Sequence, residues 1–203
     1  MRTVTGLFDN YDDATNAVAQ LEAAGVPSTD ISIIANNADN RYSDRYSDGD
    51  SNAGEGAGAG AGLGAAGGGA LGLLTGLGLM AIPGVGPVVA AGWLATTAAG
   101  AAAGAVAGGA VGGIIGAMTE SGVSEEDAHL YAEGVRRGGS VVTARVDEGL
   151  VDEAEVILRN NSVDPIGRRQ AYADTGWRRF DDQANAYTST EIEDERRRYD
   201  RTL

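Results

Sequence analysis

The sequence predicts an α+β fold: a split ferredoxin-like sandwich of two β-α-β halves, interrupted by an insertion and followed by a polar tail. Three observations predict it. Two distant stretches each have the pattern strand, helix, strand; residues 56–119 contain no charged side chain; and glycine recurs in that span at every fourth position. The predicted organisation is a first half at 1–35, a flexible linker at 36–55, a glycine-zipper helical hairpin at 56–119, a second half at 120–168 and a tail at 169–203.

The first half begins with a strand predicted at residues 2–8. Asn10 can cap the helix that follows, in which apolar residues recur at helical spacing up to Leu21. Gly25 and Pro27 end this helix, and the β-branched residues at 31–34 form the second strand. These elements make one β-α-β unit.

The second half repeats this pattern, since Val4 aligns with Val142 and Leu21 with Leu158. It comprises a strand at 141–146, a helix and a short last strand at 163–166. A further helix precedes it, which begins at Ser124 and ends at Gly138. Because both halves have the same order of elements, they are expected to form a four-stranded sheet under two helices.

Two stripes of glycine characterise the insertion. Residues four apart lie on one face of a helix, so each stripe allows another backbone to approach closely. The expected helix-packing residues are Gly56, Gly60, Gly64, Gly68, Gly72 and Gly76 in the first stripe and Gly100, Gly104, Gly108, Gly112 and Gly116 in the second.

Between the stripes, Pro83, Gly84, Gly86 and Pro87 are predicted to form the turn of the helical hairpin. Helices of about 25 and 30 residues would reach about 40 and 45 Å, enough for a hydrocarbon core of about 30 Å. Glycine disfavours an isolated helix by about 0.8–1 kcal/mol per residue relative to alanine, so helix formation should require pairing. A disordered Gly/Ala segment is the alternative.

Composition narrows the function classes. The chain has no Lys and no Cys, which excludes a Walker A lysine, a Schiff-base lysine and thiol chemistry. His129 is the single imidazole, and it is expected to be solvated on an exposed helix side rather than catalytic or bound to a metal. A net charge of −14 argues against nucleic-acid binding. We therefore expect no enzyme activity, no cofactor, no metal and no small-molecule substrate.

The polar tail contains a predicted charged helix at 190–201, with acidic residues early and arginines late, as the helix dipole favours. Its simplest interpretation is a solvated helix on a mobile tether. The alternative is that Trp177 and Phe180 anchor the tail onto a partner.

Three motifs together resemble one family. They are TVTGLFD at 3–9 with AAGVP at 23–27; AIPGVGPVVAAG at 81–92; and GVSEEDA at 122–128 with RGGSVV at 137–142. Over residues 2–168 the chain resembles bacterial heat-induced general stress proteins. This resemblance implies a stress-response role, and it carries over no catalytic residue.

The leading functional hypothesis is a non-enzymatic stress protein that self-associates through the glycine-zipper hairpin, with the hairpin inserted into the inner membrane or lying on it. No apolar run of signal-peptide length opens the sequence, so the sandwich is expected in the cytoplasm. The alternative is a soluble homo-oligomeric scaffold or storage assembly whose hairpins bury one another. A module that binds a small ligand on its sheet face has only fold analogy in its favour.

Overall fold

The computed structural model describes residues 1–39, 78–82, 84–95, 97 and 113–200. These residues form a five-stranded sheet in the order β1-β5-β2-β4-β3, with every neighbouring pair antiparallel. The α+β class is thus confirmed. The elements are β1 (Arg2–Phe8), α1 (Tyr11–Ala23), β2 (Ile31–Asn36), β3 (Gly78–Ile82), β4 (Gly86–Gly92), α6 (Ile114–Glu120), α7 (Glu125–Arg136), β5 (Ser140–Val146), α8 (Val151–Arg159), α9 (Pro165–Asp174) and α10 (Ser189–Asp200).

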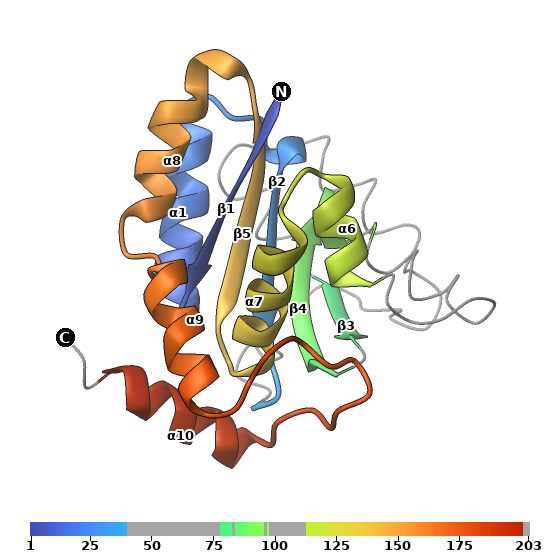
Figure 1. Cartoon of the computed structure of the whole chain (residues 1–203). Coiled ribbons are helices and arrows are strands. Elements are labelled where there is room, and N and C mark those ends of the chain that lie inside the picture. Colours follow the sequence, from blue (N-terminus) through green and yellow to red (C-terminus); the bar gives the residue numbers. More distant parts are fainter. Residues whose placement is uncertain (40–77, 83, 96, 98–112, 201–203) are drawn as a thin grey trace.

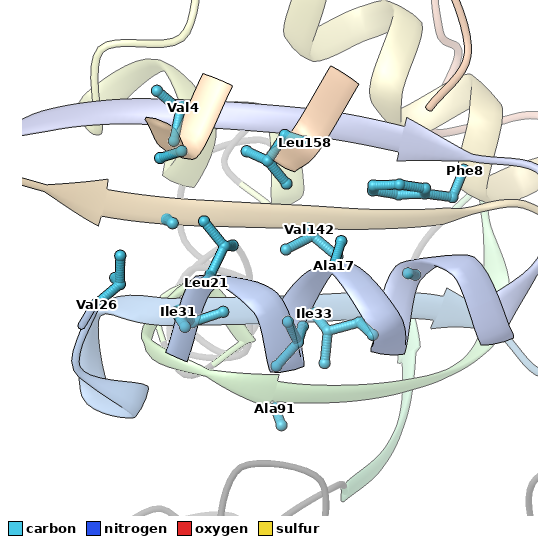
Figure 2. Packing of buried hydrophobic residues seen from close by; sticks show 14 of the residues in the cluster. Val4, Phe8, Ala17, Leu21, Val26, Ile31, Ile33, Ala91, Val142 and Leu158 are labelled. Carbon is cyan, nitrogen blue, oxygen red and sulfur yellow. The ribbon is translucent and has the colours of Figure 1, made fainter. Parts of the chain in front are cut away.

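Helices cover both faces of this sheet (Figure 1). On one face, α1 and α8 pack against the neighbouring strands β1, β5 and β2 through buried aliphatic side chains such as Leu21, Ile33, Val142 and Leu158 (Figure 2). On the other face, α6 and α7 cover Leu7, Ile34 and Val141. Burying each such side chain contributes about 1.5–3 kcal/mol, so both layers stabilise the sheet.

The predicted helix ends are confirmed where cap residues mark them. Asn10 accepts a hydrogen bond from the Asp13 N–H at 2.8 Å, and Ser124 Oγ accepts one from Asp127 N–H at 3.1 Å. Gly25 and Gly138 follow α1 and α7 with φ of 96° and 102°. Only glycine adopts this left-handed conformation without a steric cost, so these residues end the helices.

The predicted helical hairpin is wrong for residues 78–92, which form the β3–β4 hairpin instead. Val88 and Ala90 face the α6–α7 layer, while Val89 and Ala91 face the α1–α8 layer. A strand buried on both faces has a continuous apolar sequence, and such a run has no visible alternation to separate it from a buried helix. The turn was therefore located correctly, but it joins two strands.

The predicted last strand at 163–166 is also wrong. Val163 N–H donates to Leu7 C=O at 2.7 Å on the outer edge of β1, and α9 then begins at Pro165. Asp164 caps this helix and Pro165 fits its first turn, so these two residues mark a helix start. The apolar residues on either side suggested a strand instead. The four-stranded ferredoxin-like sheet is therefore not reproduced. Where its fourth strand would pair with β1, the described residues make the Val163–Leu7 hydrogen bond alone. On the opposite side of the sheet, β4 and β3 add two strands next to β2.

Part of the predicted linker belongs to the fold. Asn36 ends β2, and its buried side-chain amide donates to Val135 C=O at 3.0 Å. Asn37 is buried as well. The rest of the predicted linker, from residue 40, lies outside the described residues. Across the helices that the structure describes, none combines the length and apolar character needed to cross a bilayer.

Candidate interaction site

The C-terminal tail packs onto the body of the domain, and we call this contact the tail seam. Its body side comprises Asp39, Gly84, Gly86, Glu133 and residues 136–138; its tail side comprises residues 180–186, Ile192, Glu195 and Arg196. Figure 1 shows α10 lying across one end of the molecule, beyond α7 and α9. The expected solvated tail is thus wrong for its described part, because Phe180 and Ile192 are buried.

At one end of the tail seam, the tail covers the β3–β4 turn. Phe180 lies against Gly84, where an added Cβ atom would come within 2.7 Å of Asp181 C=O and 3.0 Å of the Phe180 ring. An added Cβ at Gly86 would lie 2.8 Å from Ala186 Cβ. Both glycines have positive φ, 73° and 99°. The turn therefore needs glycine twice over, for its backbone conformation and for contact with the tail.

An ion-pair network occupies the middle of the tail seam. Arg137 Nε donates to Glu133 Oε1 at 2.7 Å, and Arg137 Nη1 donates to Glu195 Oε2 at 3.1 Å. All three residues are buried, and the Arg137 guanidinium stacks 4.2 Å from the Tyr172 ring centroid. One arginine thus bridges a carboxylate of α7 and a carboxylate of α10.

Two further contacts fix the orientation of α10. Arg196 Nη2 donates to Gly138 C=O at 2.9 Å, and its Nη1 donates to Asp39 at 3.0 Å. Ile192 is fully buried and would lie 2.5 Å from a Cβ atom at Gly138. The glycine that ends α7 therefore also allows α10 to approach.

Next to the tail seam, Arg168 of α9 forms a bidentate pair with Asp9, with both N–O distances 2.7 Å. Its guanidinium lies 3.7 Å from the Tyr199 ring centroid on α10. Planar guanidinium groups suit both contacts at once, which an ammonium group does not. Arg168 thereby connects the start of α1, α9 and α10.

Arg137 and Arg168 both keep their proton and their positive charge. Burial lowers the pKa of Arg137, but the hydrogen bond and charge of Glu133 outweigh burial and raise this pKa overall. The same balance, with Asp9 as partner, raises the pKa of Arg168. Burial also raises the pKa of Tyr172. Both arginines therefore stay positive and Tyr172 stays neutral at any physiological pH.

His129 is buried on α7, so its expected solvation is wrong. Its Nε2 lies 3.3 Å from Arg179 Nη2 and 3.7 Å from Glu125 Oε1. Burial lowers the pKa of His129, the Arg179 charge lowers it further, and Glu125 opposes both effects. The tail residue Arg179 was too far away in sequence for its contact to be predicted.

The contacts of the tail seam hold the C-terminal tail against the body of the domain. The two buried carboxylates share Arg137 and each pairs with a second arginine, Glu133 with Arg136 at 3.5 Å and Glu195 with Arg198 at 2.8 Å. Over the residues that the structure describes, no group of three or more His, Asp or Glu side chains could hold a metal ion. The geometry holds a helix in place through charge, aromatic stacking and one buried isoleucine.

Most of the predicted helix-packing glycines lie outside the described residues; Gly116, in α6, is the exception. Of the predicted turn residues, Pro83 is not described, while Gly84, Gly86 and Pro87 form the turn and the start of β4. The structure brings this turn together with Phe180, a predicted anchor. Phe180 packs against its own chain, and Trp177 packs edge-on against Tyr172 with ring centroids 5.7 Å apart.

The fold and the tail seam together define an α+β domain closed by its own C-terminal helix. Within it, residues 3–84 match the family model of the heat induced stress protein YflT domain. Over residues 3–84, this match confirms the resemblance to heat-induced stress proteins, and the description of the domain suggests a general stress response. The matched region ends in the β3–β4 turn. It therefore includes Asp39 and Gly84 from the body side of the tail seam and no residue from the tail side. A search of curated proteins and a search of solved structures each found no match.

Proposed function

We propose that this chain is a non-enzymatic general stress-response protein that acts by self-association through its glycine-rich segments. The observation that carries the proposal is the pairing of Gly78 with Ala90 in the β3–β4 hairpin. Antiparallel pairing brings residue 78 next to the end of β4. The segment 56–77, which leads into β3, and the segment 98–112, which follows β4, therefore meet the domain at the same end of this hairpin.

This placement supports pairing of the two glycine stripes. The first segment runs toward its attachment point and the second runs away from it, so helices formed there would be antiparallel neighbours. The β3–β4 hairpin thus connects the two glycine-rich segments, which the sequence analysis expected a simple turn to do. Glycines at every fourth position then allow backbones to meet within one chain or between chains.

The same connectivity argues against a membrane-spanning hairpin. Residues 40–77 connect residue 39 to residue 78 of the domain, and residues 98–112 connect residue 97 to residue 113, so each connection would have to cross the bilayer twice. Residues 98–112 could reach only about 22 Å as a helix, whereas one crossing needs about 30 Å. The soluble homo-oligomer is therefore favoured over membrane insertion, and a surface contact with lipid is the remaining membrane role.

The test is the mass of the full chain by multi-angle light scattering with the double substitution Gly68→Leu and Gly108→Leu. Leucines on the stripes should block backbone contact and reduce the assembly. Ala66→Leu with Ala110→Leu is the matched control, because these positions lie about 200° around a helix from the stripe glycines and should leave the mass unchanged. Equal masses for the two variants would contradict the proposal.

Flotation with lipid vesicles distinguishes a soluble homo-oligomer from a surface contact with lipid. A discrete assembly that stays at the bottom of the gradient supports the soluble scaffold. Flotation of the wild-type chain, lost in the double glycine variant, would instead assign the glycine stripes to lipid contact.

A further inference from the structure

The irregular part of the tail that follows α9 crosses α7 at two places. His129 Nε2 lies 3.3 Å from Arg179 Nη2, and Arg136 Nη2 donates to Asn185 C=O at 2.9 Å. His129 and Arg136 are about two helical turns apart, so both contacts lie on one face of α7. An arginine keeps its charge at any physiological pH, whereas a histidine changes its charge near neutral pH. Of these two contacts, the one at His129 can therefore respond to pH.

The contact with Arg179 requires a neutral imidazole ring. Every nitrogen of a guanidinium group donates, so His129 Nε2 has to accept, and the ring proton lies on Nδ1. A proton added to Nε2 removes this acceptor and places two positive groups 3.3 Å apart. The histidine side chain is 9% exposed, so solvent screens their repulsion only in part. Protonation of His129 and its contact with Arg179 therefore exclude each other.

Glu125 offers the protonated ring a second partner. It lies one turn before His129 on α7, and its Oε1 atom is 3.7 Å from the same Nε2 atom. A carboxylate only accepts hydrogen bonds, so it pairs with the N–H of an imidazolium and not with a neutral Nε2. The Glu125 side chain is 74% exposed and can therefore move closer. Each charge state of His129 thus has one partner: Arg179 for the neutral ring and Glu125 for the charged ring.

We propose that His129 is a pH-sensitive switch for the tail: a proton from solvent moves Nε2 from Arg179 to Glu125 and releases residues 178–184, the tail loop, from α7. The N–H bond at Nε2 is the one covalent bond that forms, and a rise in pH reverses the step. The switch uses no glycine-rich segment, so it goes beyond the proposed function.

Release of the tail loop changes the β3–β4 turn and leaves α10 in place. Phe180, the neighbour of Arg179, is buried against Gly84, so its release uncovers the turn. Helix α10 stays docked, because Arg137 and Arg196, which bind it to the body, keep their charge. The switch is therefore local and precedes any loss of the whole tail.

The charges around His129 agree with this direction. Burial lowers the pKa of His129, the charge of Arg179 lowers it further, and Glu125 raises it. The docked tail loop therefore disfavours the proton, and by linkage the proton disfavours the docked tail loop. A fall in pH should shift the equilibrium toward release.

The other arginines on the elements packed against α7 have carboxylate partners of their own. β2 carries no charged side chain, and α6 carries Glu120 alone. The pairs are Arg145 of β5 with Asp30, Arg168 of α9 with Asp9, and Arg169 of α9 with Glu126 and Asp127. The remaining charged groups of α9 and the tail loop are Asp174, Arg178, Asp181 and Asp182.

Spin labelling of the full chain tests the switch, because the chain contains no native cysteine. A nitroxide attached through Gln183→Cys lies on the exposed part of the tail loop, and Glu193→Cys places a control label on the exposed side of α10. Between pH 8 and pH 5.5, the mobile fraction of the loop label should rise at least about twofold, while the α10 label stays unchanged. No rise at residue 183, or an equal rise at both positions, would overturn the inference.

Two substitutions identify the contact that titrates. His129→Gln keeps a side-chain oxygen that accepts from Arg179 at every pH, so it should abolish the rise. Arg179→Gln, at an exposed position, removes the repulsion and should abolish the rise as well, which keeps the test valid if His129→Gln fails to fold. A rise that persists in either folded variant would contradict the inference.

A matched pair of carboxylates tests the exchange of partners. Glu125 and Glu126 both lie in the first turn of α7, and their side chains are 74% and 73% exposed. Glu125→Gln removes the charge that favours the imidazolium, so the midpoint of the rise should move to lower pH. Glu126 pairs with Arg169 at 3.2 Å, so Glu126→Gln should leave the midpoint unchanged. Equal midpoints in the two variants would refute the role of Glu125.

Discussion

The contact between the β3–β4 turn and the tail predicts a large effect of Gly84→Ala. Gly84 has φ of 73°, and a Cβ atom there would lie 2.7 Å from Asp181 C=O and from Asp182 Cα. The variant should therefore have two costs: a strained backbone and displacement of the tail. Gly122→Ala is the matched control, since Gly122 has φ of 97° but nothing within 4 Å of an added Cβ atom.

The two costs can be separated by magnitude. A left-handed conformation costs a non-glycine residue about 1–2 kcal/mol, and this should be the full effect of Gly122→Ala. Displacing Phe180, which is 6% exposed, removes a further 1.5–3 kcal/mol or so of burial energy. Gly84→Ala should thus lower the free energy of unfolding by about 2.5–5 kcal/mol in urea titrations.

A truncated chain ending at Gly176 completes a double-mutant cycle. Without the tail, Gly84→Ala should cost about as much as Gly122→Ala, so the cycle should give a coupling energy of about 1.5–3 kcal/mol. Two results would refute the reasoning: equal destabilisation by the two alanines in the full chain, or a Gly84→Ala effect that truncation does not change.

Three further predictions use the same measurement. Burial lowers the pKa of His129 in the folded state below its unfolded value, so the unfolded state takes up the proton first as pH falls. The free energy of unfolding should therefore fall as pH falls through about 6.5. His129→Gln should flatten this dependence of stability on pH between pH 5.5 and 8. Asp9→Asn leaves Arg168 without its carboxylate and should cost about 1–2 kcal/mol, less than a buried pair because Asp9 is 42% exposed, whereas Asp152→Asn should be neutral. Leu158→Ala should cost about 2–5 kcal/mol, while Val156→Ala at a 62% exposed position should stay within about 0.5 kcal/mol.

Elements with local signals could be predicted from the sequence. Asn10, Gly25 and Ser124 mark helix ends through their own backbone preferences, so α1 and α7 were located closely. β1 and β5 were recognised because the two halves repeat. Each of these features depends on residues near one another in the chain.

The remaining features depend on distant partners. Val88 and Val89 read as helix because nothing in their sequence shows that β2 pairs with them and that helices cover both faces. Likewise, Arg137 is one of several arginines in the sequence, and only the fold places it between Glu133 and Glu195. The candidate site was therefore only half predicted: its turn and Phe180 were singled out, but their mutual contact was not.

Salt should act in opposite directions on the two kinds of contact in this chain. The tail seam depends on attraction between Arg137, Arg196 and carboxylates, although burial shields these pairs from screening. The proposed self-association through the glycine-rich segments would instead bring together chains with a net charge of −14 each, and residues 56–119 carry no charge to offset that repulsion. Added salt should therefore favour the proposed assembly while it weakens the exposed ion pairs around the tail, because the charge-free insertion is the part of this acidic protein best suited to self-association.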